Sequence, residues 1–404
     1  MSDIIVQKFG GTSVGSIERI DAVADIIKNA SKSQRIIVVV SAMAGETNKL
    51  VNLAKHFGNN PDKREFDALV STGETISSAL LSMALHSKGI NAKSYSASQI
   101  SMKTTSTYSK AKILDIDANK IMDVVKQDTI PIITGFQGIT ETGDITTLGR
   151  GGSDTTAVAI AAQVKAKRCD IYTDVDGIFT TDPKVVPNAK KLQSITMEEM
   201  LELAGQGAKV MQARAVEFAN KYNVPVRVLS SFNEGSGTLI SLEDNGMENA
   251  LVSGIAFQKD QVKFTLHGVE DTPGTAFKIL GPISEAEIEV DVIVQNVSVD
   301  GKTDFTFTVS NEDKLSVNKI IDEMREDVKF KNLIVDSDIA KVSLVGVGMR
   351  SQSGVASKAF KALSINNVNI QIISTSEIKI TMVIDKSLTD KAVNILHDAF
   401  ELDK

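Results

Sequence analysis

The sequence predicts an α/β protein: a three-layer αβα domain with a mainly parallel sheet, followed by two small α+β units. Three observations predict this architecture. Short, wholly apolar runs alternate with helical patterns in the first part of the chain. In the later part of the chain, apolar residues occupy every second position of several short segments. This part also contains an internal repeat. The predicted domains are residues 1–245, 246–340 and 341–404.

Uninterrupted apolar runs mark the strands of the first part, because parallel strands are buried on both faces. Ile20, Val23, Ala24 and Ile27 repeat at the spacing of one helical face, so an amphipathic helix follows the first strand. Strand, helix and strand in this order favour a parallel sheet with its ligand site at the carboxyl ends of the strands. The predicted strands are residues 4–6, 36–40, 130–133, 171–172 and 224–228.

Turn-forming residues at 233–250 mark the expected boundary of the first domain. Beyond it, residues 262–266, 305–309 and 378–384 alternate as half-exposed strands do. The internal repeat has two similar copies, each with a strand, a glycine loop, a helix and a second strand. The strands of the first copy are residues 264–269 and 289–295, and those of the second are residues 342–347 and 369–375. Two such units either stack for stability or form a ligand site at their mutual interface. Whether they are contiguous or interleaved stays open, because residues 251–257 suit either sheet.

The composition points to a small-molecule partner. A net charge of −7 and a pI near 5.4 disfavour the concentrated positive surface that nucleic acid or an anionic membrane requires. The single cysteine, Cys169, fits a reducing compartment and a buried position. We expect a cytoplasmic protein with no signal peptide or membrane-spanning helix, and no metal site of its own, since the four histidines lack ligand spacing.

Glycine-rich loops follow several predicted strands. Lys8 precedes Gly10 and Gly11 at a strand-to-helix junction, which suits a phosphate or is a plain turn. A second loop, residues 40–48, carries small and hydroxyl residues and is either a ligand loop or a capped turn. Arg150 stands among three glycines before an alanine-rich helix, which predicts an anion site, although Ser153 or Asp154 also suits the role of helix cap.

Residues 172–184 form a fourth loop with several aspartates, which suit either Mg²⁺ bound through water or the fixing of lysines, and Lys184 suits a phosphate. The ligand spacing of an EF-hand is absent. Phosphoryl transfer to a carboxylate needs phosphate cradles, positive charge and orientation. It requires no strong general base, because the acceptor is already ionised at neutral pH.

These blocks in this order resemble the aspartate kinase family within the amino-acid kinase superfamily, and the repeat is similar to paired ACT domains. The resemblance covers nearly the whole chain. It implies phosphorylation of the L-aspartate side chain with ATP and Mg²⁺, in the biosynthesis of lysine, threonine and methionine. The blocks are residues 8–13, 71–74, 134–138, 149–154 and 173–183.

The resemblance also implies roles for individual residues. Lys8, Arg150 and Asp154 would be catalytic. The nucleotide would contact Lys8, Phe9, Gly10, Gly11, Ser41, Thr173, Asp174, Phe179, Asp182, Lys184, Lys209 and Val210. Aspartate would contact Thr47, Glu74, Phe136, Arg150, Gly151, Gly152, Ser153 and Asp154. Relatives often carry tyrosine where Phe179 stands, so a polar contact there is in doubt.

Regulation by lysine, threonine or both is implied at the ACT repeat, in a homo-oligomer formed through these units. The effector would contact Asp271, Gly274, Ala276, Glu289, Asp291, Gln295, Val355, Ala356, Asn367, Asn369, Ile370, Ser376 and Glu377. Glu289 stands where relatives often have asparagine, which leaves the effector open. Met247 resembles an internal start for a separate short subunit, or is an ordinary methionine.

Two other functions fit parts of the sequence. A glutamate or acetylglutamate kinase would share the superfamily, but the tandem repeat disfavours it. A catalytically inactive amino-acid sensor would share the repeat, but the intact Lys8, Arg150 and Asp154 disfavour it. We expect no fused homoserine dehydrogenase.

Overall fold

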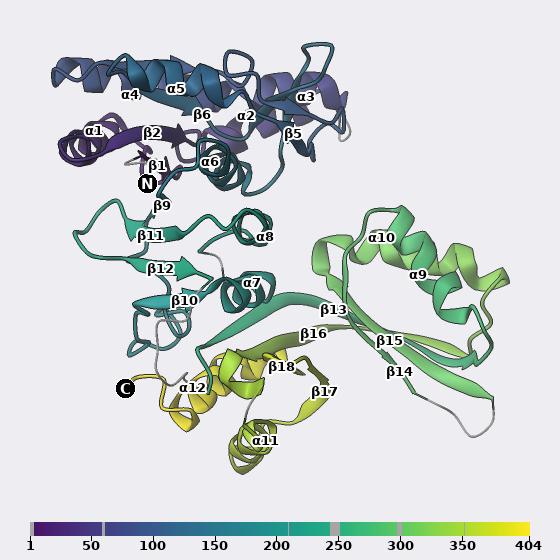
Figure 1. The fold of residues 1–404 in the computed structure, drawn as a ribbon. Coiled ribbons are helices and arrows are strands. Elements are labelled where there is room, and N and C mark those ends of the chain that lie inside the picture. Colours follow the sequence, from purple (N-terminus) through teal and green to yellow (C-terminus); the bar gives the residue numbers. More distant parts are fainter. Residues whose placement is uncertain (1–3, 59–60, 209, 243–250, 297–300, 351) are drawn as a thin grey trace. The chain divides into compact units, whose positions relative to one another are not determined.

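The computed structural model describes residues 4–58, 61–208, 210–242, 251–296, 301–350 and 352–404. Contacts within the chain divide it into two compact units. The first consists of Met1–Thr180 and Lys190–Asn249, and the second of Thr181–Ala189 and Ala250–Lys404. Figure 1 shows the elements of both units.

An eight-stranded sheet forms the centre of the first unit, in the order β10-β12-β11-β9-β1-β2-β6-β3. Neighbouring strands run parallel except β11 and β12. The strands are β1 Ile4–Phe9, β2 Arg35–Val40, β3 Ala92–Tyr95, β6 Ile130–Thr134, β9 Arg168–Thr173, β10 Ser194–Thr196, β11 Val226–Ser230 and β12 Thr238–Ser241. The predicted mainly parallel sheet is confirmed.

Helices cover both faces of this sheet. Ile20, Val23, Ala24 and Ile27 of α1 are buried against it, as their spacing predicts. The alanine-rich α6 is buried along nearly its whole length and contacts β1, β2 and β9. The helices are α1 Ile17–Ser31, α2 Glu46–Lys55, α3 Lys63–Val70, α4 Thr72–Ser87, α5 Ala118–Lys126, α6 Gly152–Gln163, α7 Met197–Gly205 and α8 Ala213–Lys221.

The alternation of side chains along β1 decides which residue faces which helix. Ile5 and Phe9 belong to the hydrophobic core that β1 and β2 share with α1 and α4. Because successive side chains of a strand point to opposite faces, Lys8 points to the other face, where α6 lies. A charged residue inside a buried strand is thereby directed to one helix.

A small four-stranded sheet, in the order β5-β4-β7-β8, completes the first unit. Its strands are β4 Lys103–Thr104, β5 Ile113–Asp115, β7 Gln137–Ile139 and β8 Ile145–Thr147. Among the described residues, Lys63–Ser87 is the one helical stretch long and apolar enough to cross a membrane, and half of its most apolar part is buried in the fold. Helices buried in the core of a folded domain share this length and composition.

A six-stranded sheet, in the order β14-β15-β13-β16-β18-β17, forms the second unit. The repeat is visible in it: Gly274 and Gly354, with φ of 95° and 96°, each precede a helix of 11 residues and then a strand of six. The elements are β13 Gly254–Glu270, α9 Thr275–Glu285, β14 Val290–Gln295, β15 Lys302–Ser310, α10 Lys314–Glu323, β16 Asn332–Val345, α11 Val355–Ile365, β17 Ile370–Thr375, β18 Lys379–Asp385 and α12 Thr389–Ala399.

The two repeats are interleaved through their long strands. Ile255 near the start of β13 packs in one core with Val342 and Leu344 of β16, whereas Val262 and Phe264 of β13 belong to the other core. Residues 251–257, which suited either sheet, therefore join the core of the second repeat. The predicted boundary at residue 340 falls inside β16.

Two predicted strands differ from the observed ones. The strand expected at 224–228 is β11, Val226–Ser230, because the Val224 N–H still donates to Ala219 at the end of α8. The strand expected to be half-exposed at 378–384 is β18, in which Thr381 and Val383 are buried as well. The Thr381 hydroxyl is hydrogen-bonded to that of Ser343 on β16, which satisfies its polar group in the interior.

We predict that Phe307→Ala lowers the free energy of unfolding of the second unit by about 3–5 kcal/mol, because Phe307 is fully buried and its loss leaves a cavity. Phe277→Ala is the matched control: its ring is 78% exposed, and the change should cost under about 0.5 kcal/mol. Urea unfolding followed by circular dichroism measures both. Equal losses in the two variants would contradict this account of the core.

Candidate active site

Five loops meet at the carboxyl edge of the eight-stranded sheet, where a ligand of a parallel sheet is expected. Each loop leaves a strand and is tied to its neighbour by a backbone hydrogen bond. The bonds run from Gly10 N to Tyr172 O (3.1 Å), Ser41 N to Phe9 O (3.1 Å), Gly135 N to Val40 O (2.9 Å) and Ser231 N to Thr173 O (2.9 Å). Loops far apart in sequence are thereby collected along one edge.

A buried ion pair joins β1 to α6 at this edge. Lys8 Nζ lies 2.6 Å from Asp154 Oδ1, and each side chain is only 11% exposed. Asp154 stands in the first turn of α6, where the helix dipole favours negative charge. An anion bound here would meet the Lys8 ammonium together with the N–H groups of the first turn of α6.

The start of α6 differs from one of the predicted alternatives. Its N-cap is Gly151, in the left-handed conformation with φ of 68°, and no side chain caps the helix. Ser153 and Asp154 lie inside the helix, so neither caps it. Their side chains are consequently available for other contacts, as the Lys8 pair shows for Asp154.

Two glycines let the β6–β7 turn approach α6 closely. A Cβ on Gly135 would lie 2.7 Å from the Ser153 side chain, and one on Gly152 would lie 2.8 Å from the Phe136 ring. Phe136 itself has φ of 68°, an uncommon conformation for a residue with a side chain. The predicted acceptor residues Phe136, Gly152 and Ser153 therefore lie where the β6–β7 turn approaches the start of α6.

Glu74 is a buried carboxylate with one free oxygen. It is 3% exposed, and its Oε1 accepts a hydrogen bond from the Ala42 N–H at 3.0 Å. Its Oε2 has no hydrogen-bond partner among the described residues. Burial raises the pKa of Glu74 to about 7. A cation would complete this site.

Arg150 and Thr47 complete the set of predicted acceptor residues. Arg150 is exposed and forms no ion pair or hydrogen bond with the described part of the chain, which leaves its guanidinium available for a carboxylate. Thr47 is half-buried in the first turn of α2.

Predicted nucleotide residues are more scattered. Thr173 and Asp174 share a hydrogen bond at the end of β9, Phe179 forms an isolated bridge to Lys191, and Val210 is half-buried. Asp182 and Lys184 belong to the second unit, and Lys209 lies outside the described residues. Their contact with a nucleotide stays a prediction.

The first glycine loop also shows how its residues are used within the protein. The Phe9 ring is fully buried and stacks on Tyr172 at 4.6 Å between centroids. The Gly10 N–H already donates to Tyr172 O. Only the backbone of Phe9 therefore borders the edge.

Sequence reasoning missed several polar residues of this edge. The Ser231 hydroxyl donates to Ser13 Oγ at 2.8 Å, which ties the loop after β11 to the first glycine loop. Gln137 is buried and donates to Ser71 O at 2.5 Å, just before Glu74. Ser231 could have been found by extending the carboxyl-edge rule to the fifth strand, whereas Gln137 lies within the block at residues 134–138 and no role is predicted for it.

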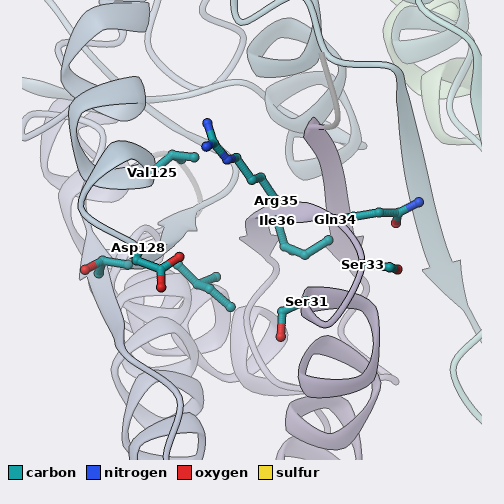
Figure 2. Close-up of a pocket in the computed structure, with 9 residues that line it drawn as sticks. Ser31, Ser33, Gln34, Arg35, Ile36, Val125 and Asp128 are labelled. Atoms are coloured by element: carbon teal, nitrogen blue, oxygen red, sulfur yellow. The ribbon is translucent and has the colours of Figure 1, made fainter. Parts of the chain in front are cut away.

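The hollow in Figure 2 lies at the other edge of the sheet. It has a volume of about 300 Å³, and its lining includes Arg35 and Ile130, the first residues of β2 and β6. It is therefore separate from the carboxyl edge. No group of three histidine, cysteine or acidic side chains in the described ranges could hold a metal ion.

The predicted effector residues of the two repeats lie at opposite edges of the six-stranded sheet. Asp291 and Gln295 are on β14, and Ile370 is on β17, the two outer strands. Within the predicted effector residues of the first repeat, Gln295 Nε2 lies 3.4 Å from Asp271 Oδ1. The other predicted effector residues flank these strands or start α9 and α11, and most are exposed.

Each outer strand is held by a lysine of the other repeat. Lys341, which is buried, pairs with Asp291, and Lys263 donates to Gln371 at the equivalent position. Desolvation lowers the pKa of Lys341 although Asp291 opposes this effect. The predicted effector strands are thus tied to the opposite repeat.

Comparison with known proteins decides the family. The amino acid kinase family model matches residues 3–230, and ACT domain models match 266–328 and 342–400. An aspartokinase of Pseudomonas aeruginosa is 55% identical over 403 residues, which cover 99% of this chain and 98% of the relative. This chain belongs to the aspartate kinase family.

Other aspartate kinases agree with this assignment. Aspartokinase 2 of Bacillus subtilis is 46% identical over 402 residues, covering 99% of this chain and 98% of the relative. The structure of E. coli aspartokinase III in complex with aspartate and ADP (R-state) has a TM-score of 0.84 at 27% identity, with 98% of this chain and 99% of that chain covered. The form in complex with lysine and aspartate (T-state) has a TM-score of 0.78 at 27% identity, with 99% and 100% covered.

We predict that Glu74→Gln stabilises the protein more at pH 8 than at pH 5. Because the pKa of Glu74 is raised by folding from 4.5 to about 7, its ionisation opposes folding, and the penalty grows between these two pH values. The penalty is about 3 kcal/mol at pH 8 and about 1 kcal/mol at pH 5.

The measurement is the free energy of unfolding of wild type and variant at both pH values. The cost of burying an amide is common to both, so the change in the difference, about 2 kcal/mol, is the readout. Glu234→Gln, at an exposed position, is the control for the substitution itself. An equal difference between wild type and the Glu74 variant at both pH values would contradict the raised pKa of the buried carboxylate.

Proposed function

We propose that this protein transfers the γ-phosphoryl group of ATP to the side-chain carboxylate of L-aspartate, giving 4-phospho-L-aspartate and ADP. The Lys8–Asp154 pair at the carboxyl edge carries this proposal, because it places a fixed ammonium where the glycine loops and the start of α6 meet. The E. coli relative that binds aspartate and ADP supports the choice of substrates. The setting is the cytoplasm, in lysine, threonine and methionine biosynthesis.

The reaction needs positioning and charge more than proton transfer. An oxygen of the aspartate carboxylate forms a bond to the γ-phosphorus while the bond to the β,γ-bridging oxygen breaks, and ADP leaves with that electron pair. Lys8 stabilises the charge on the transferring group, and Asp154 holds Lys8 in place. The acceptor is already ionised, so no residue needs to remove a proton.

The acceptor would be held through both ends of its amino-acid backbone. The free oxygen of Glu74 suits the α-ammonium, and the exposed guanidinium of Arg150 suits the α-carboxylate by bidentate bonds. Thr47, Phe136 and residues 151–153 would complete the pocket. A bound ammonium also compensates the buried charge of Glu74.

The nucleotide would lie along β1, β2 and β9, with Lys8, Gly10, Gly11 and Ser41 near the phosphates. Thr173, Asp174, Phe179 and Val210 would surround the rest of the nucleotide. Contact of Asp182, Lys184 and Lys209 with it stays a prediction. Mg²⁺ would enter as part of the MgATP substrate, carried on the phosphate oxygens.

We further propose regulation by lysine, threonine or both at the ACT repeat, in a homo-oligomer. The E. coli relative in its T-state holds lysine. Because β14 and β17 are outer strands, each offers a backbone edge to a second chain, and an effector bound beside it would bias that pairing. The division into residues 1–245, 246–340 and 341–404 stays part of this proposal, and Met247 lies outside the described residues.

The test is ADP release from MgATP with L-aspartate, L-glutamate or N-acetyl-L-glutamate as acceptor. We expect turnover with aspartate, and loss of about 10²–10³-fold in kcat for Lys8→Met, because a preorganised charge is removed from the transferring group. Turnover with glutamate or acetylglutamate alone would assign the protein to another branch. Absence of ATP turnover with every acceptor would favour an amino-acid sensor.

The same assay is repeated with lysine, threonine and both, alongside sedimentation of the protein at each condition. Suppressed turnover with a shift in assembly supports regulation through the interface. A monomer that an effector still inhibits fully would sink the interface proposal and leave the kinase assignment intact.

A further inference from the structure

Asp67 connects the two predicted ends of the acceptor pocket from inside the fold. It lies on α3 and is fully buried, and its carboxylate accepts four hydrogen bonds. Oδ2 accepts from the backbone N–H of Thr147 (2.7 Å) and of Ser109 (2.8 Å), and Oδ1 from the hydroxyls of Thr147 (2.9 Å) and Ser109 (3.0 Å). Thr147 stands three residues before Arg150.

The backbone of Asp67 reaches the other end of the pocket. Its carbonyl accepts a hydrogen bond from the Ser71 N–H at 3.1 Å, where α3 ends and α4 begins. Glu74 follows in the first turn of α4. One residue therefore holds both the loop that leads to Arg150 and the turn that leads to Glu74.

The charge of Asp67 is balanced by hydrogen bonds alone within the described residues, since no lysine or arginine among them forms an ion pair with it. A buried carboxylate that accepts four bonds is strongly fixed in place, because charge-assisted bonds are about twice as strong as neutral ones. Ser109 has φ of 66°, a strained conformation for a residue with a side chain. The two bonds from Ser109 to Asp67 offset this strain.

Arg214 holds the same two segments through their carbonyl groups. From α8 it donates to Leu148 O at 2.6 Å and to Ala111 O at 2.7 Å. The Ala111 N–H in turn donates to Thr147 O at 3.0 Å. The segments that lead to Arg150 are thus held on both sides. Asp67 accepts hydrogen bonds from their N–H and hydroxyl groups, and Arg214 donates hydrogen bonds to their carbonyl groups.

We propose that Asp67 and Arg214 are positioning residues that set the distance between Glu74 and Arg150 and thereby the affinity for the amino-acid acceptor. The proposal rests on the proposed function, because it assigns both residues to the acceptor site. Neither needs to touch the substrate. Among the described residues, the nucleotide loops after β1 and β9 donate no hydrogen bond to the Asp67 carboxylate, so ATP affinity is the internal reference.

The bonding pattern of Asp67 offers a matched pair of variants. In Asp67→Asn, the amide oxygen can accept from the two N–H groups while the amide nitrogen donates to the two hydroxyl oxygens. Asp67→Ala loses all four bonds. Arg214→Lys removes the fork that reaches two carbonyls at once while it keeps the positive charge.

The test compares KM for aspartate and for ATP in the full-length variants, with folding checked by circular dichroism and thermal unfolding. We expect Asp67→Ala to raise KM for aspartate about 30-fold, and Arg214→Lys about 10-fold, which correspond to about 2.0 and 1.4 kcal/mol. KM for ATP should stay within about twofold, and Asp67→Asn should restore aspartate KM to within about threefold of wild type.

A folded Asp67→Ala enzyme with unchanged KM for aspartate, or with equal changes in both KM values, would overturn the proposal. If that variant does not fold, Ser109→Ala with Thr147→Val decides, since it removes only the two hydroxyl bonds. A rise of threefold or more in KM for aspartate alone would then support the proposal, and a smaller change would overturn it. Wild-type enzyme that fails to phosphorylate aspartate marks failure of the proposed function instead.

Discussion

The buried ion pair between Lys8 and Asp154 joins the central sheet of the first unit to a helix. It depends on the alternation of side chains along β1, on the packing of α6 and on the dipole of that helix. Strand alternation along β1 turns Lys8 away from the core of Ile5 and Phe9, and toward α6. The α6 helix can lie against β1 because its facing residues are small. Its first turn carries Asp154 at the N-terminal end, where the helix dipole favours negative charge. Two charges with 11% exposure each would be costly apart, so the sheet and the helix hold each other in register through them.

The fold could be predicted from the sequence wherever one periodicity dominates. The spacing of Ile20, Val23, Ala24 and Ile27 gave the buried face of α1, and uninterrupted apolar runs gave the central parallel strands. The interleaving of the repeats could not be predicted, because residues 251–257 are apolar in a way that fits either core. Burial of both faces of β18 also escaped prediction, since Thr381 is polar and its partner Ser343 is 38 residues away.

The candidate site was predicted where motifs lie in loops after strands, and missed where a polar residue acts from inside the fold. Asp67 and Arg214 show no pattern in one sequence, and Gln137 lies in a block without a predicted role, because the partners of all three come from distant segments. Several residues around this edge adopt locally unfavourable states. Phe136 and Ser109 have positive φ, and Glu74 has one buried oxygen without a hydrogen-bond partner among the described residues. Such costs persist at functional sites because the surrounding contacts outweigh them.

The claim that the Lys8–Asp154 pair acts as a single catalytic unit is tested most directly by a double-mutant cycle on kcat at saturating aspartate and MgATP. The account predicts that Lys8→Met and Asp154→Asn each lower kcat strongly, and that the double variant is little worse than Lys8→Met, because Asp154 acts through Lys8. Losses that multiply in the double variant would contradict the account, since the two residues would then act independently.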